Sequence, residues 1–256
     1  MNRFAFTDLT IGYDKKRVAS NLTLAAPAGA CIALIGLNGS GKSTLMRTLS
    51  GLQPALNGSI LWNEKPLASY TTEQQAQFRS LVLTEKVIST QFRVEEFVQL
   101  GRMPYRSLQT ETNATALAQV KWAMEDTGIV DLANRYLHQL SDGQLQRVQI
   151  ARALAQDTDV LFLDEPFAHL DITHRAQIWQ LLYDLTRKHE KTVLFSLHDL
   201  DFGWEVPTAY WLLHQGNLNS YSPEELQNQN VLNEVYANSN LQFDPKQRAF
   251  VLSLNR

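Results

Sequence analysis

The chain has 256 residues, of which 44% are hydrophobic and 19% charged, and its formal net charge is −3. This composition excludes a disordered chain, and the length is sufficient for one large globular domain with a substantial core. The slight negative charge and the scattered lysines and arginines provide no basic surface, which argues against nucleic acid as a partner.

The apolar runs are short, and they exclude a membrane-spanning segment in this sequence. The longest ones, such as residues 31–35 and 160–163, have the length of core strands, far below the ~20 residues that span a bilayer. The N-terminal residues alternate in polarity and lack the apolar stretch of a signal peptide. The single cysteine, Cys31, lies within an apolar run, where it is expected to act as a small core hydrophobe. These features predict a cytoplasmic location.

In chain order, strands are expected first. Residues 1–30 alternate in polarity, with turn residues at 11–14 and 26–29, and residues 59–62 continue this antiparallel β layer. A helical spacing of apolar residues follows from about residue 94 to 156. Strand and helix patterns then alternate at 160–163, 176–185 and 192–197, as in parallel strands joined by crossover helices.

The polar residues after Gly216 contain one candidate helix, at 223–236. The expected organisation is a single domain over residues 1–256. Its core and β layer occupy about 1–85 and 158–215, a helical insertion about 86–157, and a C-terminal tail 216–256.

A phosphate-binding loop is the most specific motif. Residues 36–44 fit the pattern GxxxxGK[ST], between a predicted buried strand and a predicted helix. In such loops backbone N–H groups surround the phosphates, Lys42 reaches the β and γ phosphates, and the hydroxyl of Ser43 binds Mg²⁺. The residues predicted to contact the nucleotide here are Gly36, Leu37, Asn38, Gly39, Ser40, Gly41, Lys42, Ser43 and Thr44.

Two carboxylates follow the apolar run at 160–163. Asp164 is suited to hold Mg²⁺ and Glu165 to polarise water, because phosphoryl transfer to water needs charge neutralisation and a positioned nucleophile. Between the two motifs, Ser141 is placed to cap a helix that starts within Leu-Ser-Asp-Gly-Gln at 140–144. The start of this helix is a second candidate anion-binding surface.

Together, these motifs resemble the nucleotide-binding subunits of ABC transporters over nearly the whole chain. The resemblance implies an α/β fold: a RecA-like P-loop NTPase core with an antiparallel β subdomain and an inserted α-helical subdomain. It implies that 140–144 is the signature motif, with Ser141, Gly143 and Gln144 contacting nucleotide. It further implies that Glu165 is the catalytic glutamate, that Tyr13 stacks on adenine, that 168–171 is the D-loop, and that His198 contacts the γ-phosphate.

The implied mechanism is an ATPase cycle in a dimer. Two copies of the chain would bind two ATP molecules with Mg²⁺, each between one copy's phosphate loop and the other's signature motif. A signature helix can approach a γ-phosphate only from outside the chain that holds it. Hydrolysis would then remove the contact with His198 and let the copies separate.

The sequence departs from the family pattern at two positions. Glu85 stands where the family has a glutamine that reaches the metal, and we expect it to retain a catalytic and metal-binding role with altered metal affinity. Gln91 remains the alternative if the loop takes another register. Asp142 stands where the signature commonly has glycine, and its expected role is that of an acidic residue at a helix start.

Without a fused membrane segment, the chain resembles separate subunits that dock on a permease. The signature, the short tail and Gly-Arg-Met-Pro-Tyr at 101–105 resemble importers of iron chelates, haem and cobalamin, in which the permease works with a substrate-binding protein. That implies a peripheral position at the inner face of the cell membrane and a docking groove around residues 86–103. Val87, Ile88 and Phe92 fit either that groove or ordinary packing.

Two rival functions remain beside the importer. The first is a soluble ABC ATPase of a cytoplasmic assembly, such as iron–sulfur cluster biogenesis, which shares the same motifs and would have a soluble partner. The second is a catalytically inactive regulatory module, against which Glu165 and His198 argue. The transported substrate is not encoded in this chain, because the ATPase subunit does not touch it.

Overall fold

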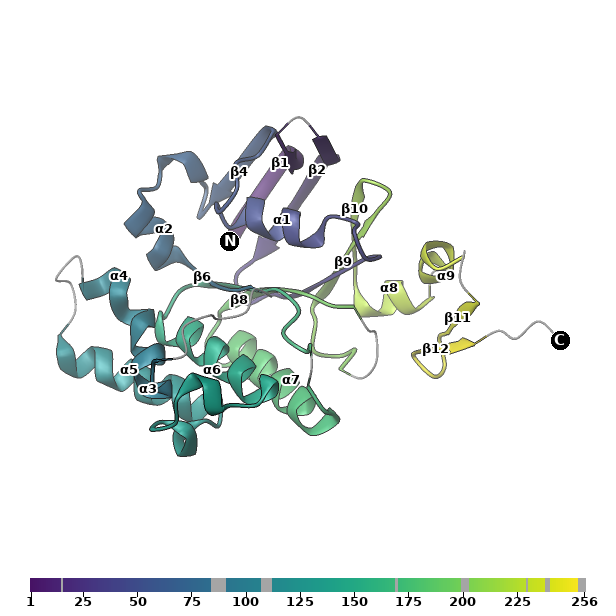
Figure 1. Cartoon of the computed structure of the whole chain (residues 1–256). Helices are drawn as coiled ribbons and strands as arrows, with labels where there is room; N and C mark the ends of the chain where they lie inside the picture. The colour runs from purple at the N-terminus through teal and green to yellow at the C-terminus, as the bar shows by residue number, and fades with distance from the viewer. Residues whose placement is uncertain are drawn as a thin grey trace.

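A computed structural model describes residues 1–14, 16–83, 91–106, 112–168, 170–198, 203–228, 230–237 and 240–252. The described elements form layers: an antiparallel sheet, helix α1 (Lys42–Leu49), a mainly parallel sheet, and a layer of helices below it (Figure 1). No described helix is both long and apolar enough to cross a membrane.

The N-terminal residues form the predicted antiparallel layer. Its strands occur in the order β2 (Lys16–Pro27), β1 (Asn2–Tyr13), β4 (Asn57–Trp62) and β5 (Lys65–Pro66). Every pairing is antiparallel, and the register places Phe4 opposite Trp62 and Phe6 opposite Leu24. The turn predicted at residues 11–14 begins later than expected, because β1 extends through Tyr13, which pairs with Lys16 of β2.

The second sheet has six strands in the order β10-β9-β3-β8-β7-β6. All its pairings are parallel except that of the edge strand β10 with β9. Every residue of β3, β7 and β8 is buried, which explains their continuous apolar runs. The bounds are β3 Cys31–Ile35, β6 Arg79–Val82, β7 Val160–Leu163, β8 Thr192–Ser196, β9 Ala209–His214 and β10 Asn217–Tyr221.

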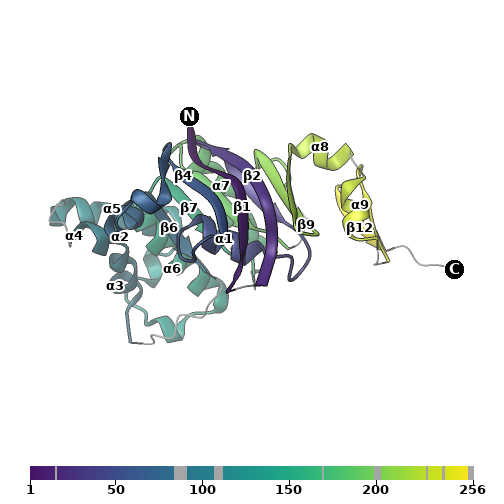
Figure 2. The same cartoon turned by 90° about the horizontal axis from the view of Figure 1, so that it is seen from above.

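One core lies between the two sheets. Leu45 and Leu49 of α1 are buried there with large aromatic side chains from both sheets, including Trp62, Phe162 and Trp211. The view from above shows the strands of the antiparallel layer crossing over this region (Figure 2). The helical spacing had included Leu52, but α1 ends at Leu49, and Leu52 is 49% exposed. The helix stops there because Gly51 adopts a φ of 75°, which a helix cannot continue.

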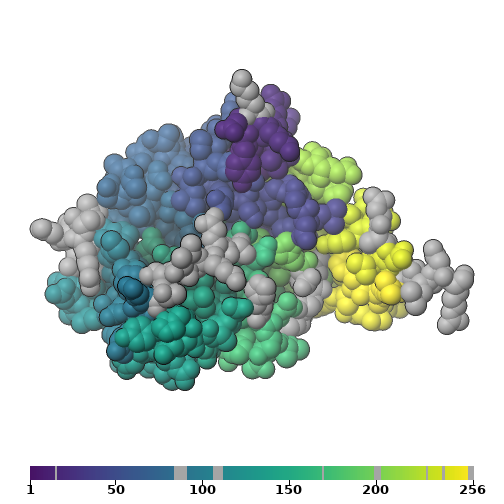
Figure 3. Space-filling view, viewed as in Figure 1, coloured from purple at the N-terminus to yellow at the C-terminus, as the bar shows by residue number. Residues whose placement is uncertain are grey.

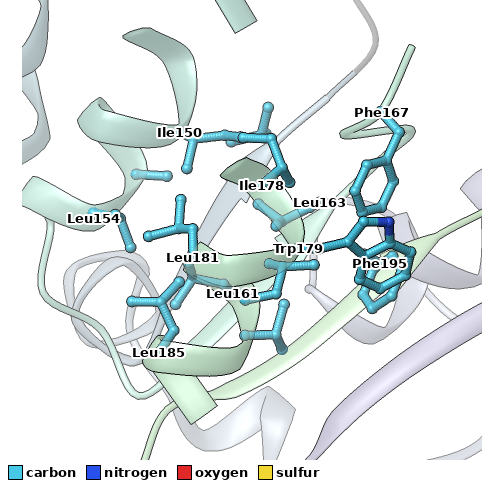
Figure 4. Packing of buried hydrophobic residues seen from close by; sticks show 14 of the residues in the cluster. Ile150, Leu154, Leu161, Leu163, Phe167, Ile178, Trp179, Leu181, Leu185 and Phe195 are labelled. Atoms are coloured by element: carbon cyan, nitrogen blue, oxygen red, sulfur yellow. The ribbon is translucent and has the colours of Figure 1, made fainter. Parts of the chain in front are cut away.

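A second core lies on the other face of the parallel sheet. Leu161 and Leu163 of β7 pack with Ile150 and Leu154 of α6 and with several side chains of α7 (Figure 4). The helices are α2 (Thr72–Phe78), α3 (Val94–Gln99), α4 (Met103–Arg106), α5 (Asn113–Asp126), α6 (Asp142–Ala155) and α7 (Ile172–Arg187), with short 3₁₀ turns at Leu67–Ser69, Leu100–Arg102, Val130–Leu132 and Leu137–Gln139. Helices α3 to α6 follow β6 and precede β7, where the helical spacing predicted them.

The C-terminal residues are more structured than expected. The single helix predicted at 223–236 is wrong: two short helices, α8 (Pro223–Asn228) and α9 (Val231–Val235), occupy this stretch. Asparagine favours helix ends over helix interiors, and Asn230 serves as the N-cap residue of α9. A hairpin of β11 (Leu241–Asp244) and β12 (Ala249–Leu252) follows. These elements form the yellow lobe at one side of the molecule (Figure 3).

Candidate active site

The phosphate loop connects β3 to α1 and needs glycine at two positions. Gly36 and Gly41 have φ angles of 149° and 108°, which favour glycine. A Cβ atom on Gly36 would lie 2.3 Å from the carbonyl oxygen of Leu213, and one on Gly41 would lie 2.4 Å from Val18. The close packing of the loop against β9 and β2 therefore excludes larger residues at both positions.

Lys42 is the first residue of α1, and its ammonium group is folded back onto the loop. Nζ donates hydrogen bonds to the carbonyl oxygens of Gly36 at 2.8 Å and Leu37 at 3.2 Å. Burial lowers the pKa of Lys42, while the nearby carboxylates of Glu165 and Asp164 oppose that shift. The lysine thus provides a partly desolvated positive charge beside the exposed backbone of the loop, where it can bind phosphate strongly.

Asp164 and Glu165 follow the carboxyl end of β7, and a serine on the neighbouring strand fixes both. The hydroxyl of Ser196, the last residue of β8, donates to Oδ1 of Asp164 at 2.7 Å and accepts the backbone N–H of Glu165 at 2.7 Å. Glu165 adopts a φ of 52°, an uncommon conformation for this residue type. The two hydrogen bonds to Ser196 thus hold in place the turn that carries both carboxylates.

Sequence reasoning missed Ser196. One feature of the sequence could have indicated it: Ser196 is the polar last residue of an apolar strand. Neighbouring parallel strands end at the same edge of a sheet. The pairing of Leu163 with Phe195 places the ends of β7 and β8 side by side.

His198 lies next to Glu165. Its Nε2 atom contacts Oε1 of Glu165, and both side chains remain about one-third exposed. The structure therefore brings together Glu165, which was predicted to polarise water, and His198, which was predicted from a separate part of the sequence to contact the γ-phosphate.

A cavity of about 730 Å³ joins these groups to the phosphate loop. Tyr13 lies at its margin, half-exposed, with its hydroxyl 3.2 Å from Oγ1 of Thr44. The residues lining the cavity are Tyr13, Lys16, Val18, Asn38, Gly39, Gly41, Lys42, Ser43, Thr44, Glu165 and His198. Lys16 and Val18 were not predicted, although Lys16 pairs with Tyr13 across the β1–β2 hairpin.

The predicted signature residues form a helix N-terminus at a separate place. Ser141 caps α6 as predicted: its hydroxyl accepts the backbone N–H of Gln144 at 3.3 Å, and Oε1 of Gln144 accepts the N–H of Ser141 at 3.1 Å. Gly143 is buried, and a Cβ atom there would lie 3.0 Å from Leu170. Among the described residues that line the cavity, none comes from this motif.

Four residues named in the sequence analysis lie outside the described residues: Glu85, Val87, Ile88 and the D-loop residue His169. The alternative residue, Gln91, is described and exposed. The assignment of the metal-linked position therefore stays a prediction.

The oxygen atoms at this edge of the sheet fit Mg²⁺. Asp164 is a buried carboxylate near Lys42, and Ser43, the residue after Lys42, lines the cavity at the start of α1. Mg²⁺ is commonly held by one or two protein oxygens together with substrate phosphates and water. In the described part of the chain, no cluster of three or more His, Cys, Asp or Glu side chains suited to a metal occurs.

The family model for ABC transporters matches residues 19–168. The ferric enterobactin transport ATP-binding protein FepC of Escherichia coli is 35% identical over 229 residues, covering 89% of this chain and 84% of the relative. The iron(3+)-hydroxamate import ATP-binding protein FhuC of Bacillus subtilis is 36% identical over 201 residues, covering 78% and 75%. The hemin import ATP-binding protein HmuV of E. coli O157:H7 is 34% identical over 237 residues, covering 90% of each chain.

Among solved structures, the chain is similar to that of a putative metal-chelate type ABC transporter in an inward-facing conformation. The TM-score is 0.80 at 24% identity, and the match covers 93% of this chain and 90% of the other. This likeness confirms the predicted α/β fold of an ABC ATPase. The phosphate loop and the paired acidic residues supply the matching chemistry for ATP. The chain belongs to the ABC transporter family, as an ATP-binding subunit with ATPase activity.

Proposed function

We propose that this chain powers the import of an iron chelate, haem or a related chelate such as cobalamin, by hydrolysing ATP beside a separate membrane permease. The observation that carries this proposal is the set of relatives named as iron-chelate and hemin import ATP-binding proteins, at 34–36% identity over most of the chain. These names favour the importer over the alternative of a cytoplasmic cluster-assembly ATPase.

In the proposed reaction, the phosphate loop binds the phosphates of ATP through its N–H groups and Lys42. Glu165 accepts a proton from the attacking water as general base, and His198, which contacts Glu165, also contacts the γ-phosphate. Ser43, Asp164 and, outside the described residues, Glu85 are the proposed ligands of Mg²⁺. Bound there, Mg²⁺ would neutralise negative charge on the phosphate oxygens.

One chain is proposed to carry half of each ATP site. The signature residues Ser141, Gly143 and Gln144 lie at the N-terminus of a 14-residue helix and do not line the cavity of the same chain. That helix N-terminus is suited to meet a γ-phosphate held by a second copy, where its N–H groups and dipole favour the anion. ATP would therefore bring two copies together.

The permease is proposed to dock near the start of α3. Phe92 and Tyr136 are 36% and 37% exposed, and Arg93 lies over the Tyr136 ring at 5.0 Å while its backbone bridges to Tyr136. In the sequence, these two exposed aromatic residues, Phe92 and Tyr136, lie between the undescribed residues 84–90 and the signature motif at 140–144. Docking there would place the chain at the inner face of the cell membrane and link it indirectly to a substrate-binding protein. No nucleic acid partner is proposed.

The test is affinity purification of the tagged full-length chain from solubilised membranes of its host, with mass spectrometry of the proteins recovered. A co-purifying polytopic permease is expected, with recovery lost in Phe92→Asp and retained in Leu241→Asp. Leu241 is a matched control, because it is 38% exposed and lies on β11, at the other side of the molecule from α3 (Figure 2). Recovery of soluble partners alone would contradict the importer and favour the assembly ATPase.

A further inference from the structure

The segment that carries His198 is held at its near end by β8. Leu197 donates its backbone N–H to the carbonyl oxygen of Leu34 at 3.0 Å, next to the start of the phosphate loop. The structure describes this segment again from Gly203, five positions after His198. On the two sides of residues 199–202, which the structure does not describe, the chain is therefore held at Leu197 and again at Gly203 and Trp204.

Gly203 is the first part of that second anchor. It adopts a φ of 95°, and a Cβ atom there would lie 2.4 Å from the indole ring of Trp179. Trp179 in turn stacks on Phe167 at 4.5 Å and meets Phe195 edge-on at 5.6 Å (Figure 4). Phe167 follows Glu165 by two positions and Phe195 precedes Ser196, so the backbone at Gly203 rests on the same aromatic group as the catalytic turn.

Trp204 is the second part. Its ring is buried between Tyr210 of β9 and Phe243 of β11, with centroid distances of 5.4 Å to each, and the Tyr210 hydroxyl donates to its carbonyl oxygen at 3.2 Å. Its indole Nε1 is buried and has no hydrogen-bond partner among the described residues. Because the indole N–H is unpaired, packing holds this ring in place.

Phe243 supplies that packing from the C-terminal module, which we define as residues 223–252. Phe243 is 3% exposed, and its backbone N–H donates to Oδ1 of Asn233 in α9. At the surface, Arg248 pairs with Glu205 at 3.0 Å, next to Trp204. The module thus contacts the residues after His198 both in the core and at the surface.

We propose that Phe243 is a positioning residue for ATP hydrolysis, acting through Trp204 on the segment that carries His198. This inference rests on the proposed role of His198. Side chains at a reaction centre need to be held within a fraction of an ångström, and a loop with one anchor released samples more conformations. Loss of the Phe243 ring is therefore expected to impair turnover more than ATP binding, since the phosphate loop has its own contacts.

The experiment compares Phe243→Ala with Phe250→Ala in the full-length chain. Phe250 is a matched control from the same hairpin, since its described ring contacts are with Tyr236 at 4.6 Å and Phe243 at 5.4 Å and do not include Trp204. Phe243→Ala is expected to lower kcat about tenfold with KM for ATP changed less than about twofold, and Phe250→Ala to change kcat less than about twofold. Phe243→Leu, which retains apolar volume, is expected to recover most of the rate.

Two results would overturn the inference: wild-type kcat in a folded Phe243→Ala, or an equal loss of kcat in Phe250→Ala. Circular dichroism and thermal unfolding establish folding. If Phe243→Ala does not fold, Phe243→Val against Phe250→Val gives the same comparison, because valine replaces less of the ring's volume than leucine does. His198→Ala is measured in parallel. If it hydrolyses ATP at the wild-type rate, the proposed role of His198 fails; if it is impaired and Phe243→Ala is not, only the present inference fails.

Discussion

Replacing Ser196 by alanine tests the link between Asp164, a proposed ligand of Mg²⁺, and Glu165, the proposed general base. The hydroxyl is buried and makes two hydrogen bonds of 2.7 Å, one to the Asp164 carboxylate and one from the Glu165 backbone N–H. A hydrogen bond to a charged group contributes about 1.5–3 kcal/mol, and an unpaired buried N–H costs about 1–3 kcal/mol. Because the Glu165 N–H is only partly buried, we expect Ser196→Ala to lower the free energy of unfolding by about 2–4 kcal/mol.

Turnover should fall as well, because Glu165 loses the contact that holds its positive φ. A displacement of about 1 Å at a reacting group can cost about a hundredfold in rate, so we expect kcat to fall by one to two orders of magnitude. Urea unfolding gives the stability change, and steady-state phosphate release gives kcat and KM.

Ser80→Ala is the matched control. Ser80 is a buried serine of β6 whose hydroxyl accepts from Thr158 at 3.1 Å, and it lies on the parallel sheet without contacting the catalytic carboxylates. It should lose about 1 kcal/mol of stability and keep its turnover. Wild-type kcat in Ser196→Ala, or an equal loss of kcat in Ser80→Ala, would refute the positioning argument.

Four further outcomes are expected. Lys42→Ala should abolish tight MgATP binding in calorimetry, because the desolvated ammonium is lost; retained affinity would contradict its role. Glu165→Gln should bind ATP, nearly stop turnover and trap a dimer in size-exclusion chromatography, whereas rapid hydrolysis would refute the general-base assignment. Burial raises the pKa of Cys31 from 9.0 to about 12, so iodoacetamide at pH 8 should modify it only after unfolding, and stability should fall as pH rises above 9.0. Comparing the ATPase rates of Glu85→Gln and Gln91→Ala tests the loop register, and an effect from Gln91 alone would contradict the assignment of Glu85.

The fold was predictable where the sequence pattern is local. The continuous apolar runs of β3 and β7 and the glycine-rich loop after β3 specify buried strands and the turn into α1, because each requires particular residue types at fixed spacing. The end of α1 and the division of 223–236 into two helices were missed. In both cases the apolar spacing continues past the point where Gly51 or Asn230 changes the backbone.

The candidate site was predictable at its motifs and less so at the contacts between them. Lys42, Asp164, Glu165 and His198 were named from the sequence. The structure places Lys42, Glu165 and His198 around one cavity, and Asp164 next to Glu165 on the same serine. The contribution of Ser196 depends on which strand lies next to β7, and strand order is a long-range property. For the same reason, the packing of Phe243 on Trp204 could not be found from spacing, because Trp204 lies in the turn before β9 and Phe243 lies in β11, 39 positions further along the chain.

Helix α6, which begins at the signature motif, is hydrogen-bonded to the parallel sheet of its own chain. Arg152 donates to the carbonyl oxygen of Leu81 at 3.1 Å, and Gln156 donates to that of Arg79 at 3.1 Å, so the helix is fixed along its C-terminal half to β6. Its N-terminus extends to Ser141, away from these bonds. A displacement of that N-terminus by a second copy's γ-phosphate would therefore act on β6, which pairs with the strand that carries Asp164 and Glu165.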